Sequence, residues 1–171
     1  MKLSSSATKP SLRELCLLSL LGALMLALQV AASGLPNIHF TAPLIILTAI
    51  FFGWKSLYAI FVFIMLEGLV WGFGLWWICY WYLWPLLAVP AVLWRKERSP
   101  LFWAIIAAVH GLLFGGLYAL IYYFVGGWEM VFAKWISGIP FDLAHCAGNF
   151  VLTLLLFKPL YNVFEKIMLK S

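Results

Sequence analysis

Several side chains that could carry chemistry lie inside segments that are otherwise apolar. Asp142, His145 and Asn149 follow an i, i+3, i+7 spacing, which places them on one face of a helix. Glu67 lies in a separate apolar stretch. A charged group inside an apolar span is costly, so these residues are candidates for ligand binding. Two interpretations of the stripe are open: it hydrogen-bonds neighbouring helices, or it lines a ligand cavity.

A second pattern is an aromatic face between residues 76 and 84. Aromatic side chains commonly form a belt at a membrane interface. The alternative is a stacking wall for a planar or cationic ligand. The deepest member favours the wall, because it lies about 13 Å from the start of the segment. The members follow an i, i+3, i+4, i+7 spacing and are Trp77, Tyr80, Trp81 and Trp84.

The elements that must position these residues are membrane helices. Of 171 residues, 65% are apolar and 10% are charged, whereas soluble domains have about 45–50% and about 25%. One membrane helix takes about 20 residues, so the chain has room for about six. We therefore expect an all-α integral membrane protein with six transmembrane helices. Its predicted parts are a tail at 1–14, a membrane domain at 15–162 and a second tail at 163–171.

Turn and start signals divide the chain into apolar runs. Ser11 is a helix start signal, and Pro100 marks the start of the fifth run. A short interfacial segment is expected after Gly126, ending near Ile136. The basic start of the first run also describes a signal peptide, but cleavage would leave five spans without improving the charge bias, so we favour a retained helix. The runs are 15–32, 40–52, 57–73, 75–94, 101–125 and 139–161.

The basic residues are sorted along the chain. Ten of the eleven Lys and Arg fall before the first run, in alternate connections or near the end, and Lys134 is the exception. This positive-inside pattern predicts that both termini are cytoplasmic. It also argues against nucleic acid as the partner of the net charge of +5. The three Cys residues form no C-x-x-C pair, so they predict neither a disulfide framework nor a zinc site, and no cofactor is expected.

Small residues form further patterns on the predicted helices. Ala23, Ala27 and Ala31 make a stripe on the first helix, against which a partner helix or another part of this chain could pack. Two Gly-x-x-x-Gly spacings, beginning at Gly68 and Gly111, predict close approach of helices.

Known catalytic motifs are missing from the sequence. It contains no H-E-x-x-H motif, nucleophile elbow or phosphate loop. It also has no inverted repeat of the kind found in many stand-alone transporters. The alternative kept open is a small multi-pass membrane enzyme, or another stand-alone transporter, that uses Glu67, Asp142 and His145.

The whole chain resembles the substrate-binding S component of an energy-coupling factor transporter. The resemblance rests on the six short helices, the inside termini, the alanine stripe, the Gly34-Leu35-Pro36-Asn37 turn and the Leu-Glu-Gly-Leu-Val-Trp-Gly-Phe-Gly stretch at 66–74. It implies a subunit of a prokaryotic cell membrane that captures a vitamin or micronutrient. It also implies a transmembrane coupling (T) subunit and two cytosolic ATPase subunits as partners.

The resemblance further implies where partner and substrate bind. In that family an Ala-x-x-x-Ala surface on the first helix meets the coupling subunit, which corresponds here to Ala23, Ala27 and Ala31. Substrate is expected near the outer face, beneath loops that correspond to 33–41, 73–76 and 126–138.

The predicted ligand site combines the polar and aromatic residues. The carboxylates would bind an amino-bearing ring, the aromatic rings would stack on it, and the histidine and asparagine would orient its polar edge. A net acidic site argues against a phosphate ester, and a cationic, thiamine-like heterocycle fits best. The site residues are Glu67, Trp71, Trp77, Tyr80, Trp81, Trp84, Asp142, His145 and Asn149.

Overall fold

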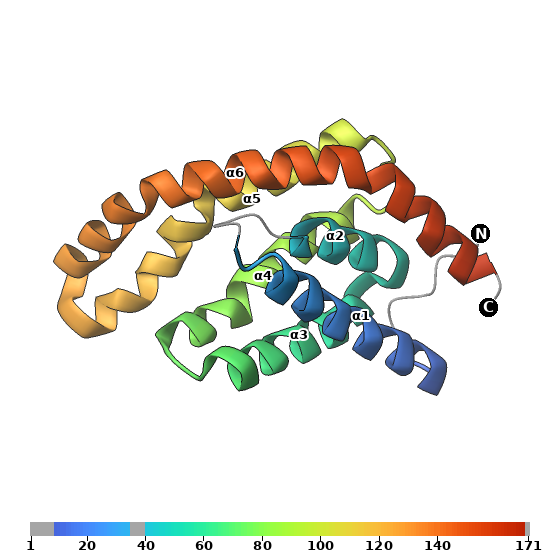
Figure 1. Cartoon of the computed structure of the whole chain (residues 1–171), viewed down its shortest axis with the longest axis horizontal. Coiled ribbons are helices and arrows are strands. Elements are labelled where there is room, and N and C mark those ends of the chain that lie inside the picture. Colours follow the sequence, from blue (N-terminus) through green and yellow to red (C-terminus); the bar gives the residue numbers. More distant parts are fainter. Residues whose placement is uncertain (1–8, 35–39, 170–171) are drawn as a thin grey trace.

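The computed structural model describes residues 9–34 and 40–169, and in these ranges it is helical with no strand. Figure 1 shows α6 running along one side of the molecule beside α5, with α2 and α4 between this pair and the helices α1 and α3. The elements are α1 (Leu12–Ala31), α2 (Thr41–Phe52), η1 (Gly53–Lys55), α3 (Ser56–Trp71), α4 (Leu75–Leu93), α5 (Pro100–Ala119), η2 (Leu120–Tyr122) and α6 (Tyr123–Leu169).

Within the described ranges, four helical stretches are long and apolar enough to cross a membrane. They are Leu12–Ala31, Thr41–Trp71, Leu75–Leu93 and Pro100–Leu169. The all-α class is thereby confirmed. The last stretch folds back on itself as a helical hairpin of α5 and α6 (Figure 1). α2 has 12 residues and would cover only about 18 Å of a hydrocarbon core about 30 Å thick.

Local sequence explains where the helices begin and end. Ser11 caps α1, since its backbone N–H donates to Glu14 Oε2 at 2.8 Å and its hydroxyl accepts from Glu14 N at 3.2 Å. Ser99 caps α5, and Pro100 occupies the first turn as predicted. α3 ends at Gly72, whose φ of 86° is a conformation that favours glycine.

The region after α5 differs from the prediction. No separate interfacial segment follows Gly127, because the helix that begins after this residue continues without a break past residue 139. The non-helical backbone is confined to Gly126 and Gly127, the latter at a φ of 63°. Pro140 does not end the helix, since a proline removes only one backbone donor.

The predicted tails are partly helical in the structure. α6 continues through the segment predicted as the second tail as far as Leu169, and Phe164 packs there on Phe51, with ring centroids 5.5 Å apart. The tail at 1–14 is described only from residue 9, and α1 already begins at Leu12. The predicted turn at 34–37 lies outside the described residues except for Gly34.

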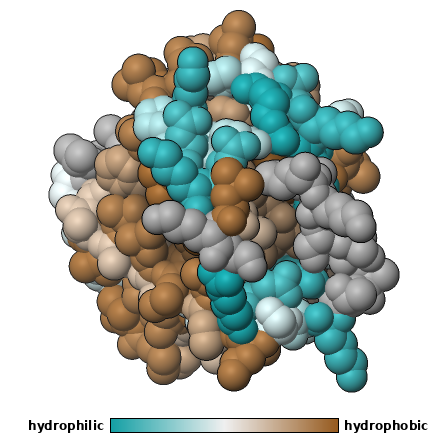
Figure 2. All heavy atoms as spheres, turned by 90° about the vertical axis from the view of Figure 1, so that its right-hand side faces the viewer, coloured by the Kyte–Doolittle hydropathy of each residue, from teal (hydrophilic) through white to brown (hydrophobic). Residues whose placement is uncertain are grey.

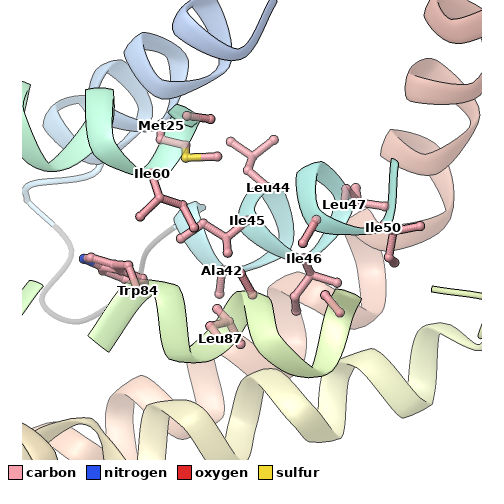
Figure 3. Packing of buried hydrophobic residues seen from close by; sticks show 14 of the residues in the cluster. Met25, Ala42, Leu44, Ile45, Ile46, Leu47, Ile50, Ile60, Trp84 and Leu87 are labelled. Atoms are coloured by element: carbon pink, nitrogen blue, oxygen red, sulfur yellow. The ribbon is translucent and has the colours of Figure 1, made fainter. Parts of the chain in front are cut away.

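α2 forms the centre of the hydrophobic core. All of its 12 residues are buried. Figure 3 shows its side chains between Met25 and Ile60, from α1 and α3, and Trp84 and Leu87, from α4. α2 also contacts α5 and α6. The other helices therefore pack around a short apolar helix that has no exposed face.

Charged side chains gather at one end of the molecule, here called the basic end. Lys55 Nζ lies 2.9 Å from Glu14 Oε1. Arg95 donates to two carbonyl oxygens at the end of α2, at 3.0 and 3.3 Å. Arg98 lies over the ring of Tyr161 at 4.7 Å. Figure 2 looks onto this end and shows hydrophilic side chains there, with hydrophobic side chains along the flank. The α3–α4 and α5–α6 turns lie at the opposite end (Figure 1).

Candidate functional site

A cavity of about 390 Å³ lies between α4, α5 and α6, near the start of α4 and thus towards the opposite end. We call it the α4–α6 cavity. Its volume is within the range of about 300–1,000 Å³ that small-ligand sites occupy. Polar and aromatic side chains from all three helices line it, among them Trp76, Tyr80, Phe114, Tyr118, Lys134, Asp142 and His145.

Asp142 is the carboxylate of the α4–α6 cavity. Its side chain is 5% exposed. Oδ1 accepts a hydrogen bond from the backbone N–H of Gly115 at 2.8 Å. Oδ2 is buried and has no hydrogen-bond partner among the described residues. An acceptor left without a donor in a buried place is costly, by about 1–3 kcal/mol, so a donor from a ligand would stabilise it.

The close approach of α5 and α6 depends on the two glycines of one predicted spacing. A Cβ on Gly115 would collide with the Asp142 carboxylate. A Cβ on Gly111 would lie 2.9 Å from the backbone of His145 and Cys146. The prediction that this Gly-x-x-x-Gly lets helices approach is confirmed.

The polar stripe on α6 combines both predicted roles. Asp142 and His145 line the cavity, and the His145 ring packs on Phe114 with centroids 4.9 Å apart. Asn149 lies deeper, outside the cavity lining, and its Nδ2 donates to the carbonyl oxygen of Ala107 at 3.2 Å. Thr153, which the sequence analysis missed, continues the buried face by another turn.

Two members of the predicted aromatic face point towards α5. Tyr80 lines the cavity. Trp84 is fully buried behind it, with ring centroids 5.6 Å from Tyr80 and 5.5 Å from Phe114. It also lies beside His110, whose Nε2 is 2.9 Å from the carbonyl oxygen of Leu83. Trp84 therefore supports the cavity wall from behind.

The other predicted aromatic residues lie away from the cavity. The Trp77 indole N–H donates to the carbonyl oxygen of Ile64 at 2.9 Å, which holds its ring against α3. Trp81 is exposed and meets Phe61 edge-on at 5.5 Å. Trp71 is exposed at the end of α3. The structure thus does not bring these three tryptophans together with Asp142.

Glu67 belongs to a second buried polar cluster. It is 1% exposed, and its Oε1 has no hydrogen-bond partner among the described residues. The Tyr80 side chain lies near both Glu67 and Gln29. Gln29 in turn accepts a hydrogen bond from Thr41 at 3.2 Å. This cluster joins α1 to α4, and Tyr80 connects it to the α4–α6 cavity.

Eight residues of the cavity wall were not among the predicted site residues, and four of them add chemistry to it. Trp76, Phe114 and Tyr118 add aromatic surface, and Lys134 adds a positive charge. Lys134 had a visible signal, because it is the exception to the sorting of basic residues. It also lies at the beginning of a helical series, with an i, i+4, i+7, i+8, i+11 spacing, formed by Lys134, Gly138, Phe141, Asp142 and His145.

The chemistry that the cavity offers is hydrogen bonding, charge pairing and stacking. Within residues 9–34 and 40–169, no three His, Cys, Asp or Glu side chains lie close enough together to hold a metal ion. A further groove of about 560 Å³ lies on the same α5–α6 hairpin, bordered by apolar side chains such as Leu117 and Trp135. Asp142 borders both hollows.

The alanine stripe lies on the outside of α1. Ala23, Ala27 and Ala31 are all exposed. Gly22 faces the other way, since a Cβ there would collide with the backbone of Ala59 on α3. α1 therefore packs on α3 through Gly22 and leaves the alanines uncovered.

Comparison of the chain with family models, curated proteins and solved structures finds no match.

Proposed function

We propose that this protein is the substrate-binding subunit of an ATP-driven importer, which holds a small heterocyclic ligand in the α4–α6 cavity. The observation that carries the proposal is the incomplete hydrogen bonding of the buried Asp142 carboxylate. This buried carboxylate borders a cavity lined by aromatic rings, and it has one oxygen hydrogen-bonded to Gly115 and the other without a donor among the residues that the structure describes. A ring N–H or amino group of a ligand would satisfy the free oxygen, and the aromatic side chains would stack on the ring.

The proposed orientation places the cavity on the outer side of a prokaryotic cell membrane. Six helices would then lie within the bilayer, with α2 enclosed by the others. The ion pairs and basic side chains gathered at one end support a cytoplasmic position for that end. Both termini would be cytoplasmic, and the cavity, which lies towards the opposite end, would open outward.

The proposed partners are a transmembrane coupling subunit and two cytosolic ATPase subunits, which would supply ATP hydrolysis. The exposed alanine stripe on α1 supports this part of the proposal. Small side chains without a neighbour in this chain give a smooth surface that another membrane helix can approach closely.

Affinity purification from membranes of the native host tests the importer. We expect ATPase and coupling subunits to accompany the wild-type protein. Ala27→Trp should reduce their yield at least about tenfold, because a bulky ring blocks close helix approach. Leu155→Trp is the control, since Leu155 is also exposed but lies on α6.

Two outcomes would contradict this proposal. One is a wild-type protein that never brings an ATPase with it, or whose partners remain after Ala27→Trp. The other is turnover of a lipid substrate by the isolated protein, which would support the alternative of a membrane enzyme.

A further inference from the structure

We infer that the ligand of the α4–α6 cavity is a planar ring with a hydrogen-bond donor at one end and a single acidic group at the other. The donor would bind Asp142, and the acidic group would bind Lys134. This inference rests on the proposed function and specifies the class of its ligand.

Lys134 is a basic residue outside the segments that hold the other lysines and arginines. Ten of the eleven basic residues follow the sorted pattern, and Lys134 does not. It lies in the wall of the α4–α6 cavity. Its Nζ is 5.0 Å from the centre of the Tyr122 ring, a contact that holds the ammonium group without neutralising it. Among the residues that the structure describes, the one ion pair is that of Lys55 with Glu14.

The spacing of the two charged groups sets the size of the ligand. Lys134 and Asp142 lie eight residues apart on α6, which corresponds to a rise of about 12 Å. A lysine side chain can bend towards the cavity, so a ligand about 8–12 Å long reaches both groups. Trp76, Phe114 and Tyr118 lie in the wall of the same cavity, and their rings suit a flat ligand.

Charge balance disfavours two other ligand classes, a purely cationic ring and a phosphate ester. A purely cationic ring would satisfy Asp142 but bring a like charge towards Lys134. A phosphate ester would satisfy Lys134 but bring two negative charges towards Asp142. Asp142 is buried, so a negative charge brought beside it is costly, whereas a donor at Asp142 and one negative group near the exposed Lys134 fit best. A thiamine-like cation was expected from the sequence because the charge of Lys134 was not considered there.

Matched pairs of probes test this inference on the full-length protein in lipid nanodiscs. The pairs are indole-3-acetate and indole-3-acetamide, and pterin-6-carboxylate and pterin, with thiamine as the cation. Binding is followed by quenching of tryptophan fluorescence and by calorimetry. We expect at least one acid to bind about tenfold or more tightly than its neutral counterpart, which is the contribution of one charge-assisted hydrogen bond.

Variants of Lys134 show whether that residue binds the acidic group of the ligand. Lys134→Gln should remove the preference for the acid without weakening the neutral counterpart, and Lys134→Arg should keep it. Lys158→Gln, an exposed lysine towards the other end of α6, should change nothing. Tighter binding of thiamine or of the neutral probes, or a preference that survives Lys134→Gln, overturns the inference.

A second measurement applies if none of the probes binds to the protein. The purified protein is denatured, and the small molecules it releases are identified by mass spectrometry. A released molecule with an acidic group and a ring donor supports the inference. A released molecule that lacks an acidic group overturns the inference but is consistent with the proposed function as a substrate-binding subunit. A protein that binds and releases no small molecule contradicts the proposed function itself.

Discussion

At the scale of single residues, the contact between Gly115 and Asp142 fixes the candidate site. The glycine N–H holds one carboxylate oxygen, and the missing side chain leaves room for the carboxylate between α5 and α6. The second oxygen is buried and has no hydrogen-bond partner among the described residues. Packing and binding therefore depend on one position of the chain.

Gly115→Ala should impair both stability and binding. The added Cβ collides with the Asp142 carboxylate, so α6 must shift or the side chain must turn away. Overpacking of this kind costs about 1–3 kcal/mol in the free energy of unfolding. Equilibrium unfolding in detergent and a ligand titration measure the two effects.

Gly138→Ala is the matched control for that substitution. Gly138 also borders the cavity, but a Cβ there meets nothing within 4 Å. Alanine in a helix interior is favoured over glycine by about 1 kcal/mol, so this variant should be at least as stable as the wild type. Equal stability and equal binding of the two variants would contradict the role given to Gly115.

The sequence showed which residues share a helix face but not what covers each face. The spacing of Asp142, His145 and Asn149 correctly predicts one buried face of α6. The spacing of the aromatic residues on α4 is equally regular, yet Trp77 packs on α3 and Trp81 is exposed. The reason is that α4 has different neighbours on different sides, and a sequence pattern holds no information on their positions.

At the scale of elements, α2 organises the core. Its run of apolar residues predicted a short helix, but an apolar residue fits both lipid and a protein core. The central position of α2 could therefore not be predicted. The structure shows twelve buried residues in contact with helices on all sides (Figure 3).

Ile45→Ala should reveal this central position. Ile45 is fully buried, and its truncation leaves a cavity that costs about 2–5 kcal/mol in the free energy of unfolding. Leu113→Ala removes a comparable side chain from an exposed site on α5, so it should have little effect. Both values come from unfolding of the purified variants. A similar loss of stability in the two would mean that α2 is not enclosed as described.

At the scale of the whole molecule, the charges and the cavity lie towards opposite ends. The sorting of basic residues along the sequence predicted that their connections share one side, and the contacts of Lys55, Arg95 and Arg98 with Glu14, Ile50 and Tyr161 show that these connections meet. The continuous α6 was not predicted, because Gly138 and Pro140 are typical of a break. That continuity places Lys134 and Asp142 on one rigid helix.

The measurement that tests the central claim most directly is the affinity of the bound small molecule for Asp142→Asn, compared with the wild type. The molecule is the one released from the purified wild-type protein, and its dissociation constant is measured by calorimetry. Loss of the carboxylate should weaken binding at least about tenfold. Glu165→Gln, which removes a carboxylate near the C-terminal end of α6, should leave the affinity unchanged. Equal affinity of wild type and Asp142→Asn, or no bound molecule in the wild type, would contradict the assignment of the α4–α6 cavity as the binding site.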